Sequence, residues 1–341
     1  MAKNKILVVG GGSWGTAFAN YLAASGDPAP REVKIWIREK EVIDSIRSIR
    51  ENSIFLPGIK LAPGLIPVHR LKKEAGAADI IIFAVPSKFI RNTFKELKHS
   101  LKNKKIVNLS KGFEATSLKT ISQLAQEILG PGVMERWVTI SGPSFAAELA
   151  RRHPTVVVAC SPNAALAEVI QEDFSSDMLR IYRCDDLTGI EVAGSMKNVM
   201  AIASGIVNGC GYGYNTTASL VTRASVEISR FGLKLGAKAE TFWGLAGIGD
   251  LMLTCFGHLS RNFRLGQRIA KGESLNQIES SSAMVAEGVE TTKAIKLLSD
   301  KLGIEMPITA EVYEILFNNK NPHEAVKALM KRRLKPEWNI N

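Results

Sequence analysis

The feature that most constrains the fold is a glycine-rich turn directly after a short apolar run at the N-terminus. Lys5–Val9 is rich in β-branched residues, as buried strands are, and Thr16–Ser25 is rich in helix formers. The turn between them has the spacing G-x-G-x-x-G at Gly10, Gly12 and Gly15. In such a turn the glycines permit a tight bend, backbone approach to a pyrophosphate and close helix–strand packing, and the helix N-terminus offers free N–H groups. The order of these elements predicts a dinucleotide-binding unit.

The end of the second predicted strand bears on the choice of cofactor. Val33–Ile37 is followed by Arg38, where an NAD site commonly presents Asp or Glu to the ribose 2′-hydroxyl. An arginine can instead bind a 2′-phosphate, although Glu39 and Glu41 lie close by and exposed arginines are common. We expect NADP(H) to be preferred and NAD(H) to be accepted.

The patterns divide the chain into two halves of different class. Further apolar runs occur at Asp79–Val85, Lys105–Leu109, Trp137–Ile140 and Thr155–Ala159. Continuous apolar strands separated by helical stretches predict a mainly parallel sheet covered on both faces. Pro143 and Pro154 lie near the last of these runs, where a mixed edge is expected.

Only helical patterns follow residue 186, and 341 residues suit two domains. We predict an α/β Rossmann-type NAD(P)-binding domain over residues 1–188 and an all-α substrate and catalytic domain over residues 189–341.

Composition excludes several classes of protein. The formal charge of +11 comes from 44 basic and 33 acidic residues, but the basic residues are scattered, apart from a modest cluster at 331–335. They are not interleaved with aromatics, so no nucleic-acid partner is indicated, and anionic cofactor and substrate account for part of the excess. The four cysteines, Cys160, Cys184, Cys210 and Cys255, lie far apart and indicate neither a disulfide framework nor a zinc site, so no metal is expected.

The N-terminal sequence enters the first strand at once, and the longest apolar stretch is broken by Asn208 and several glycines. We therefore expect a cytoplasmic protein without stable membrane insertion.

Candidate ligand contacts follow the predicted strands, since ligands of open parallel sheets collect beyond the carboxyl ends of the strands. Ser13 and Trp14 lie in the glycine turn, Lys111 follows the fourth strand, and Gly142 and Ser144 follow the fifth. Lys111 could also be an ordinary loop lysine, and Ser144 could simply cap the short helix that follows it.

Two isolated charges stand in apolar segments of the helical half. Lys197 is the only charged residue between Val192 and Thr222, and Asp250 is the only one in 242–257. Opposite charges in two such segments predict a buried pair, because each lowers the desolvation cost of the other. The pair could be purely structural, and Lys197 could extend its ammonium to solvent from a helix edge. A desolvated lysine also has a pKa drawn toward neutrality, which suits general acid–base catalysis.

A predicted helix N-terminus near Asp250 offers an anion site. Ser260 is a good N-cap, and Arg261 and Asn262 add donors at the positive end of the helix dipole. A capped surface helix is the alternative. Together these features indicate a dehydrogenase that acts on a small phosphorylated alcohol or ketone.

The chain closely resembles the bacterial-type NAD(P)-dependent sn-glycerol-3-phosphate dehydrogenases. The matching stretches span almost the whole chain: Val9–Ala17, Ser110–Glu114, Ser141–Glu148, Val192–Gly205, Gly244–Cys255, Ser260–Asn262 and Val285–Thr292. The resemblance implies reversible reduction of dihydroxyacetone phosphate to sn-glycerol 3-phosphate for glycerophospholipid synthesis, and a homodimer. Trp14 stands where the family often has Tyr or Phe, and the chain is longer between Gly26 and Val33.

The resemblance also assigns roles to residues. It marks Lys197 as the proton donor and acceptor. It implies substrate contacts by Lys111, Gly142, Ser144, Asp250, Ser260, Arg261 and Asn262. It implies cofactor contacts by Ser13, Trp14, Arg38, Lys111, Ala146, Arg261, Val285 and Glu287, beside the turn glycines Gly10, Gly12 and Gly15.

Two alternatives remain open at this point. A β-hydroxyacid or ketopantoate-type reductase shares the plan of sheet and helices with a catalytic lysine, but does not need Arg261 for a phosphate. A non-catalytic dinucleotide sensor is the other alternative, and the presence of both Lys197 and Asp250 argues against it.

Overall fold

The computed structural model describes residues 4–24, 31–281 and 286–337. It divides into two compact units: the first unit comprises residues 1–111 and 121–187, and the second comprises residues 112–120 and 188–341. The segment 112–120 belongs to the second unit although it lies between two strands of the first, which the sequence pattern does not indicate.

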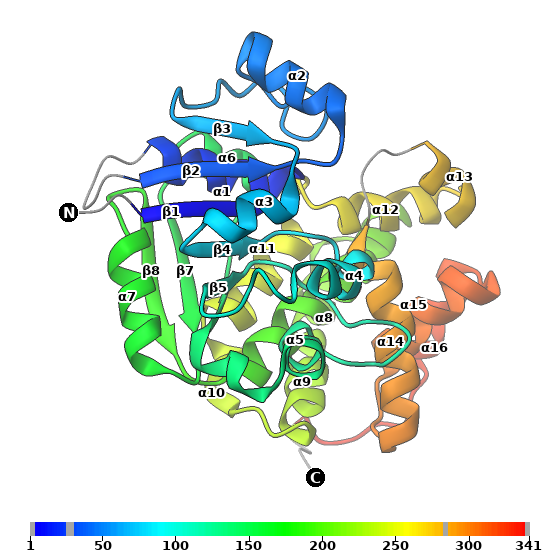
Figure 1. The fold of residues 1–341 in the computed structure, drawn as a ribbon. Helices are drawn as coiled ribbons and strands as arrows, with labels where there is room; N and C mark the ends of the chain where they lie inside the picture. The colour runs from blue at the N-terminus through cyan, green and yellow to red at the C-terminus, as the bar shows by residue number, and fades with distance from the viewer. Residues whose placement is uncertain (1–3, 25–30, 282–285, 338–341) are drawn as a thin grey trace. The chain divides into compact units, whose positions relative to one another are not determined.

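The first unit is built on one sheet whose strand order is β3-β2-β1-β4-β5-β6-β7-β8 (Figure 1). The strands are β1 (Asn4–Val9), β2 (Arg31–Trp36), β3 (Leu65–Val68), β4 (Ile80–Phe83), β5 (Lys105–Asn108), β6 (Trp137–Ser141), β7 (Thr155–Cys160) and β8 (Leu179–Cys184). Neighbouring strands are parallel except β6 and β7, which confirms the mainly parallel sheet and its mixed edge.

Helices cover both faces of this sheet, because successive residues of a strand point to opposite faces. Ile6 and Val8 of β1 pack in one apolar core with α1, α2, α6 and α7, whereas Leu7 and Val9 pack in another with α3, α4 and α5. The helices are α1 (Ser13–Ala24), α2 (Lys40–Ile49), α3 (Leu71–Ala77), α4 (Ser87–Leu97), α5 (Ile121–Leu129), the 3₁₀ turn η1 (Pro131–Arg136), α6 (Ala146–Ala150) and α7 (Ala164–Phe174).

Two strands and the start of one helix differ from what the sequence pattern predicts. β3 and β8 lie at the two ends of the strand order, and buried positions alternate with more exposed ones along both. β3 has only four residues and includes Pro67, and polar residues interrupt the apolar ones in β8, so neither resembles the apolar runs of the central strands. The residue pattern of Ser117–Leu129 is also typical of a helix, but the helix begins only at Ile121. Ser117 lies in the segment 112–120, where it donates a hydrogen bond to the Glu114 carboxylate.

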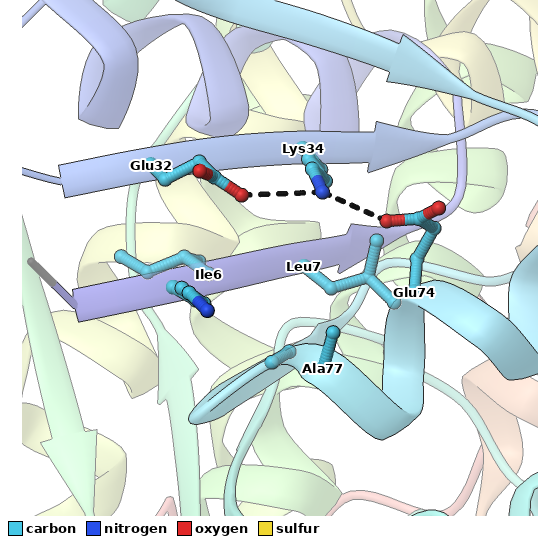
Figure 2. A pocket seen from close by; sticks show the side chains of 8 residues that line it. Ile6, Leu7, Glu32, Lys34, Glu74 and Ala77 are labelled. Carbon is cyan, nitrogen blue, oxygen red and sulfur yellow. Dashed lines mark hydrogen bonds and ion pairs between the residues drawn. The ribbon is translucent and has the colours of Figure 1, made fainter.

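A small hollow beside β1, β2 and α3 is closed by charges that pair with one another (Figure 2). The Lys34 ammonium lies 2.8 Å from the Glu74 carboxylate and 3.1 Å from that of Glu32. The hydrogen bond to Glu74 raises the pKa of Lys34; burial opposes it, and the bond to Glu32 adds to it. These contacts tie α3 to the sheet. Lys34, Glu32 and Glu74 therefore have a structural role at this hollow.

The second unit is helical, as predicted. Its elements are α8 (Leu187–Gly209), α9 (Tyr214–Lys234), α10 (Ala239–Trp243), the π turn η2 (Leu245–Gly249), α11 (Asp250–Phe256), α12 (Arg261–Ala270), α13 (Leu275–Ser280), α14 (Glu287–Leu302), α15 (Pro307–Asn318) and α16 (Pro322–Met330). Within the described part of the chain, α8 alone has the length and hydropathy to cross a membrane, and 94% of its most apolar window is buried inside the structure. The helix is the core of this unit.

Glycines let α12 pack closely against α8. A Cβ at Gly205 would lie 2.0 Å from the Phe263 carbonyl oxygen, and one at Gly266 would lie 2.2 Å from that of Ile202. Only glycine fits such a backbone approach. This packing sets the N-terminus of α12 alongside the helix that carries Lys197.

Candidate active site

The glycine turn of the first unit has the tight backbone geometry that its spacing predicts. Gly10 has a φ of +124°, and a Cβ there would lie 2.4 Å from the Ala84 carbonyl oxygen. A Cβ at Gly15 would lie 2.1 Å from the Gly10 carbonyl oxygen, whereas one at Gly12 would meet none of the described atoms within 4 Å. Gly10 and Gly15 thus serve the turn and the packing, and Gly12 leaves room in front of the N-terminus of α1.

A buried asparagine that the sequence analysis missed holds this turn in place. The Asn52 amide donates to the Gly11 carbonyl and to the Thr16 hydroxyl, both at 2.8 Å, and its oxygen accepts from the Phe55 N–H. The Ser13 hydroxyl donates to the Phe55 carbonyl at 2.6 Å. A lone Asn in a polar loop carries no recognisable pattern, so only the structure reveals this contact.

At the end of β2 the Arg38 guanidinium is exposed and paired with its neighbour. Arg38 donates to one Glu39 carboxylate oxygen at 3.0 and 2.8 Å, and its side chain is 66% exposed. The guanidinium lies over the Phe89 ring at 5.4 Å, and the Lys88 ammonium lies 5.0 Å from the same ring. Two cations on one exposed ring make a surface suited to an adenosine phosphate, and the sequence analysis did not single out Lys88.

Ser144 follows β6, and the structure shows whether it caps the short helix that comes next. The Ser144 hydroxyl donates to the Gly142 carbonyl at 2.9 Å, and Phe145 is the N-cap of α6, so Ser144 does not cap this helix. Gly142 has a φ of +140°, and a Cβ there would lie 3.0 Å from the Val157 Cα. Ala146 begins α6, and both Ala146 and Trp14 are partly buried against the core of the first unit.

Lys111 is the last residue of the first unit before the chain enters the second. The next residue, Gly112, donates its N–H to the Ser195 hydroxyl at 2.9 Å, and Ser195 in turn donates to the Glu191 carbonyl at 2.6 Å. The peptide that follows Lys111 is therefore anchored to α8, two residues before Lys197. Ser195 is a further residue that sequence reasoning missed.

The two isolated charges of the second unit meet. The Lys197 ammonium lies 2.5 Å from the Asp250 carboxylate, and the two side chains are 12% and 0% exposed. Asp250 is the first residue of α11, so the positive end of the helix dipole also stabilises its charge. Thr254, one turn later, donates its hydroxyl to the Asp250 carbonyl at 2.6 Å. The alternative of an exposed Lys197 is wrong, because its side chain is nearly buried.

The turn before Asp250 explains its position. Gly247 interrupts the helical geometry with φ −89° and ψ −105°, and a Cβ there would lie 2.2 Å from the Phe242 carbonyl oxygen. The π turn therefore needs a glycine, and it redirects the chain so that α11 starts at the carboxylate. Burial raises the pKa of the Cys255 thiol, while Lys197 lowers it and Asp250 raises it, so Cys255 lies in the same charged surroundings.

The N-terminus of α12 has the expected cap. The Ser260 hydroxyl accepts from the Phe263 N–H at 3.2 Å, which leaves its own proton free to be donated. The Asn262 side-chain oxygen accepts from the Gly288 N–H at 3.0 Å, and Arg261 is exposed. A Cβ at Gly288 would lie 2.8 Å from the Asn198 carbonyl oxygen, so α8, α12 and the start of α14 converge beside Lys197.

The remaining predicted contacts belong to this region of the chain. Glu287 is the first residue of α14, and Val285 lies outside the described residues. Among the described residues no group of three or more His, Cys, Asp or Glu side chains could hold a metal ion.

Comparison with known proteins shows a full-length likeness. Residues 5–167 match the family model described as NAD-dependent glycerol-3-phosphate dehydrogenase N-terminus, and residues 186–327 match that of its C-terminus. A glycerol-3-phosphate dehydrogenase (NAD(P)+) of Trichlorobacter lovleyi is 45% identical over 334 residues, which cover 98% of this chain and 99% of the relative.

Solved structures agree with this. The crystal structure of glycerol-3-phosphate dehydrogenase from Coxiella burnetii has a TM-score of 0.91 at 33% identity and covers 97% of this chain and 99% of that one. A PanE/ApbA family ketopantoate reductase from Ralstonia eutropha has a TM-score of 0.59 at 16% identity, covering 94% of this chain and 99% of that one. The second likeness is one of fold alone.

Proposed function

Since the chain belongs to the NAD-dependent glycerol-3-phosphate dehydrogenase family, we propose that it catalyses the reversible reduction of dihydroxyacetone phosphate to sn-glycerol 3-phosphate with NADPH or NADH. The observation that carries the proposal is the nearly buried Lys197–Asp250 pair. An ammonium withdrawn from water beside a fixed carboxylate is a proton donor of defined position.

Lys197 is the general acid of the reduction and the general base of the oxidation. When bound, a nicotinamide supplies or accepts the hydride at the carbon that bears the reacting oxygen. Lys197 polarises that carbonyl oxygen and gives it a proton, and in the reverse direction it takes the proton from the alcohol. Asp250 accepts a hydrogen bond from the ammonium, so it favours the charged lysine and fixes its orientation.

The first unit fits the pyrophosphate and adenosine of such a cofactor. The open space at Gly12, the donor groups at the N-terminus of α1, and the Arg38 guanidinium over Phe89 support this assignment. Ser13, Trp14, Ala146, Lys111, Arg261, Val285 and Glu287 complete the proposed cofactor contacts. Arg38 favours NADP(H), and the adjoining Glu39 carboxylate allows NAD(H).

The second unit holds the substrate phosphate in this proposal. Ser260 and Asn262 present polar groups at the positive end of α12, and Arg261 adds a permanent cation. Lys111, Gly142 and Ser144 supply the remaining substrate contacts. We further propose that the enzyme acts in the cytoplasm as a homodimer, and that its product feeds glycerophospholipid synthesis.

The test is the oxidation of NADPH and NADH, followed by absorbance, with dihydroxyacetone phosphate and with unphosphorylated dihydroxyacetone. We expect turnover of the phosphate ester only, and a lower KM with NADPH than with NADH. Arg261→Ala should raise the KM for the ester by about 10-fold or more, in line with the loss of a charge-assisted contact. Absence of turnover with either cofactor contradicts the proposal, and an unchanged KM in Arg261→Ala contradicts the phosphate site.

A further inference from the structure

Two cysteines lie side by side at the end of the sheet in the first unit. Cys160 is the last residue of β7 and Cys184 the last of β8, and the two are direct partners in the parallel ladder. Neighbouring strands lie about 4.8 Å apart. A disulfide joins Cα atoms that are roughly 4.4–6.8 Å apart, so this register brings the two residues within its reach.

Their thiols already interact. The Cys160 thiol hydrogen-bonds with the Cys184 sulfur and lowers the pKa of Cys184; burial opposes this, and the Asp186 backbone N–H lowers it further. Cys160 is 0% exposed, whereas Cys184 is only partly buried. The Asp185 and Asp186 carboxylates raise the pKa of Cys184, but the net shift is downward. Cys184 is thus a partly exposed thiol whose thiolate form is favoured, and Cys160 is a buried thiol directly beside it.

The other two cysteines have opposite properties. Burial raises the pKa of Cys210, which follows α8, and of Cys255, which lies in α11. Both belong to the second unit. The pKa of the Cys184 thiol is therefore shifted downward, whereas the pKa values of Cys210 and Cys255 are shifted upward.

The end of β8 can accommodate a covalent link. β8 is an outer strand of the sheet, and Cys184 ends it, so a small shift toward β7 breaks no pairing with a further strand. Two residues, Asp185 and Asp186, separate Cys184 from Leu187, the first residue of α8. A link at this point would fix the strand that leads into the helix carrying Lys197.

We propose that Cys160 and Cys184 form a reversible intramolecular disulfide by exchange with a low-molecular-weight disulfide such as oxidised glutathione. The Cys184 thiolate attacks one sulfur of the oxidised glutathione, which forms a mixed disulfide and releases one glutathione thiolate. Cys160 then loses its proton and attacks the Cys184 sulfur, which releases the second glutathione. The protein loses two electrons and two protons, and one glutathione disulfide becomes two thiols.

The test uses the full-length protein incubated with oxidised glutathione, blocked with an alkylating reagent under denaturing conditions and analysed by intact mass and peptide mapping. We expect two of the four cysteines to escape alkylation, a peptide that links residues 160 and 184, and full recovery of alkylation after dithiothreitol. Cys160→Ser should instead accumulate glutathione on Cys184.

The matched control is Cys210→Ser, which should leave the yield of the linked peptide unchanged, whereas Cys184→Ser should remove it. A wild-type protein whose four thiols all remain alkylated overturns the proposal. So does glutathione retained on Cys184 while Cys160 stays intact, or a link that includes Cys210 or Cys255. The wild-type peptide map decides the matter even if a serine variant fails to fold.

Discussion

The glycine turn of the first unit and the Lys197–Asp250 pair of the second, the two central features of the proposed site, are built in opposite ways. The turn is made of backbone: its shape rests on the positive φ of Gly10 and on the missing side chains of Gly12 and Gly15. The pair is made of side chains: two charges, 12% and 0% exposed, meet because α8 and α11 pack together.

The difference determines what each site tolerates. A backbone turn fails when an atom is added: a Cβ at Gly10 or Gly15 meets a carbonyl oxygen that cannot move aside, and one at Gly12 fills the space proposed for the ligand. A buried ion pair fails when an atom is removed, because the partner that remains is an uncompensated charge.

Removal of the lysine should have the largest effect. In Lys197→Met we expect kcat to fall by roughly 10²–10⁴, the usual contribution of a positioned general acid, while cofactor affinity is retained. The unfolding free energy should fall by about 3–5 kcal/mol, because Asp250 stays buried without its partner. Steady-state kinetics, nucleotide-binding fluorescence and urea denaturation measure the three quantities.

The double variant Lys197→Met/Asp250→Leu separates catalysis from stability. An apolar pair of similar size should restore most of the unfolding free energy without restoring turnover. Lys234→Met, at the exposed end of α9, is the matched control and should change neither quantity. Turnover that survives in Lys197→Met would remove the lysine from the mechanism.

Adding one carbon to the glycine turn should have the next largest effect, and it should depend on position. In Gly15→Ala the new Cβ would lie 2.1 Å from the Gly10 carbonyl oxygen, so we expect a loss of about 1–3 kcal/mol in unfolding free energy as well as weaker cofactor binding. Gly12→Ala meets none of the described atoms within 4 Å, so the melting temperature should hold while the cofactor Kd rises by about tenfold or more. Calorimetry and fluorescence titration measure both. Equal cofactor affinity in Gly12→Ala and the wild type contradicts the pyrophosphate assignment.

The same contrast explains what could be predicted from sequence. The glycine turn is local, so its spacing and its flanking residues predicted the strand, turn and helix that the structure has. Lys197 and Asp250 stood out because charge is rare in apolar segments, and desolvation makes their pairing favourable. Ser260 was recognisable because N-caps have a characteristic residue preference.

What could not be predicted depends on contacts between distant residues of ordinary type. Asn52 holds the glycine turn and Ser195 anchors the peptide after Lys111, but neither has a distinctive spacing. β3 was missed because it is only four residues long and contains Pro67, and β8 was missed because polar residues interrupt its apolar ones. The segment 112–120 joins the second unit through tertiary packing, for example that of Phe113 on Phe231, which no local pattern shows.

A second buried carboxylate of the helical unit, Glu227, shows how a buried carboxylate behaves when its hydrogen-bond donors are neutral groups and not an ammonium. The Glu227 carboxylate accepts from the Ile308 N–H and the Thr309 N–H at 2.9 Å and from the Thr309 hydroxyl at 2.7 Å. Burial raises its pKa in spite of these donors. Between the ordinary value of 4.5 and the raised one, the folded state therefore keeps a proton that the unfolded state has lost.

Stability should consequently fall as the pH rises through this window, by at most about 1.4 kcal/mol per pH unit, and level off above it. Glu227→Gln removes the titrating group, so its unfolding free energy should lack this slope. Urea denaturation of both proteins from pH 4.5 toward neutrality measures the difference. If the unfolding free energy of the wild type instead rises with pH relative to that of the variant, the three donors outweigh burial and the pKa of Glu227 is lowered.

The smallest effect is expected at the exposed Arg38–Glu39 pair, where solvent screens both charges. Such pairs contribute about 0–1 kcal/mol, so a 2′-phosphate can displace the Glu39 carboxylate at little cost. In Arg38→Ala we expect kcat/KM with NADPH to fall by about tenfold, with little change for NADH. Glu39→Gln should instead raise kcat/KM with NADPH relative to NADH. The Arg38 guanidinium is then free to bind the 2′-phosphate, and the ribose hydroxyls of NADH lose the Glu39 carboxylate as an acceptor.

Lys40→Ala is the charge-matched control at the adjacent exposed position, and it should leave the ratio of the two cofactors unchanged. If the ratio changes equally in Lys40→Ala and Arg38→Ala, the preference comes from the general positive charge of this edge. If only Arg38→Ala changes it, the preference comes from one side chain that stacks on Phe89. The adenosine end would then be selective through an exposed side chain, even though the adjoining cradle is made of backbone.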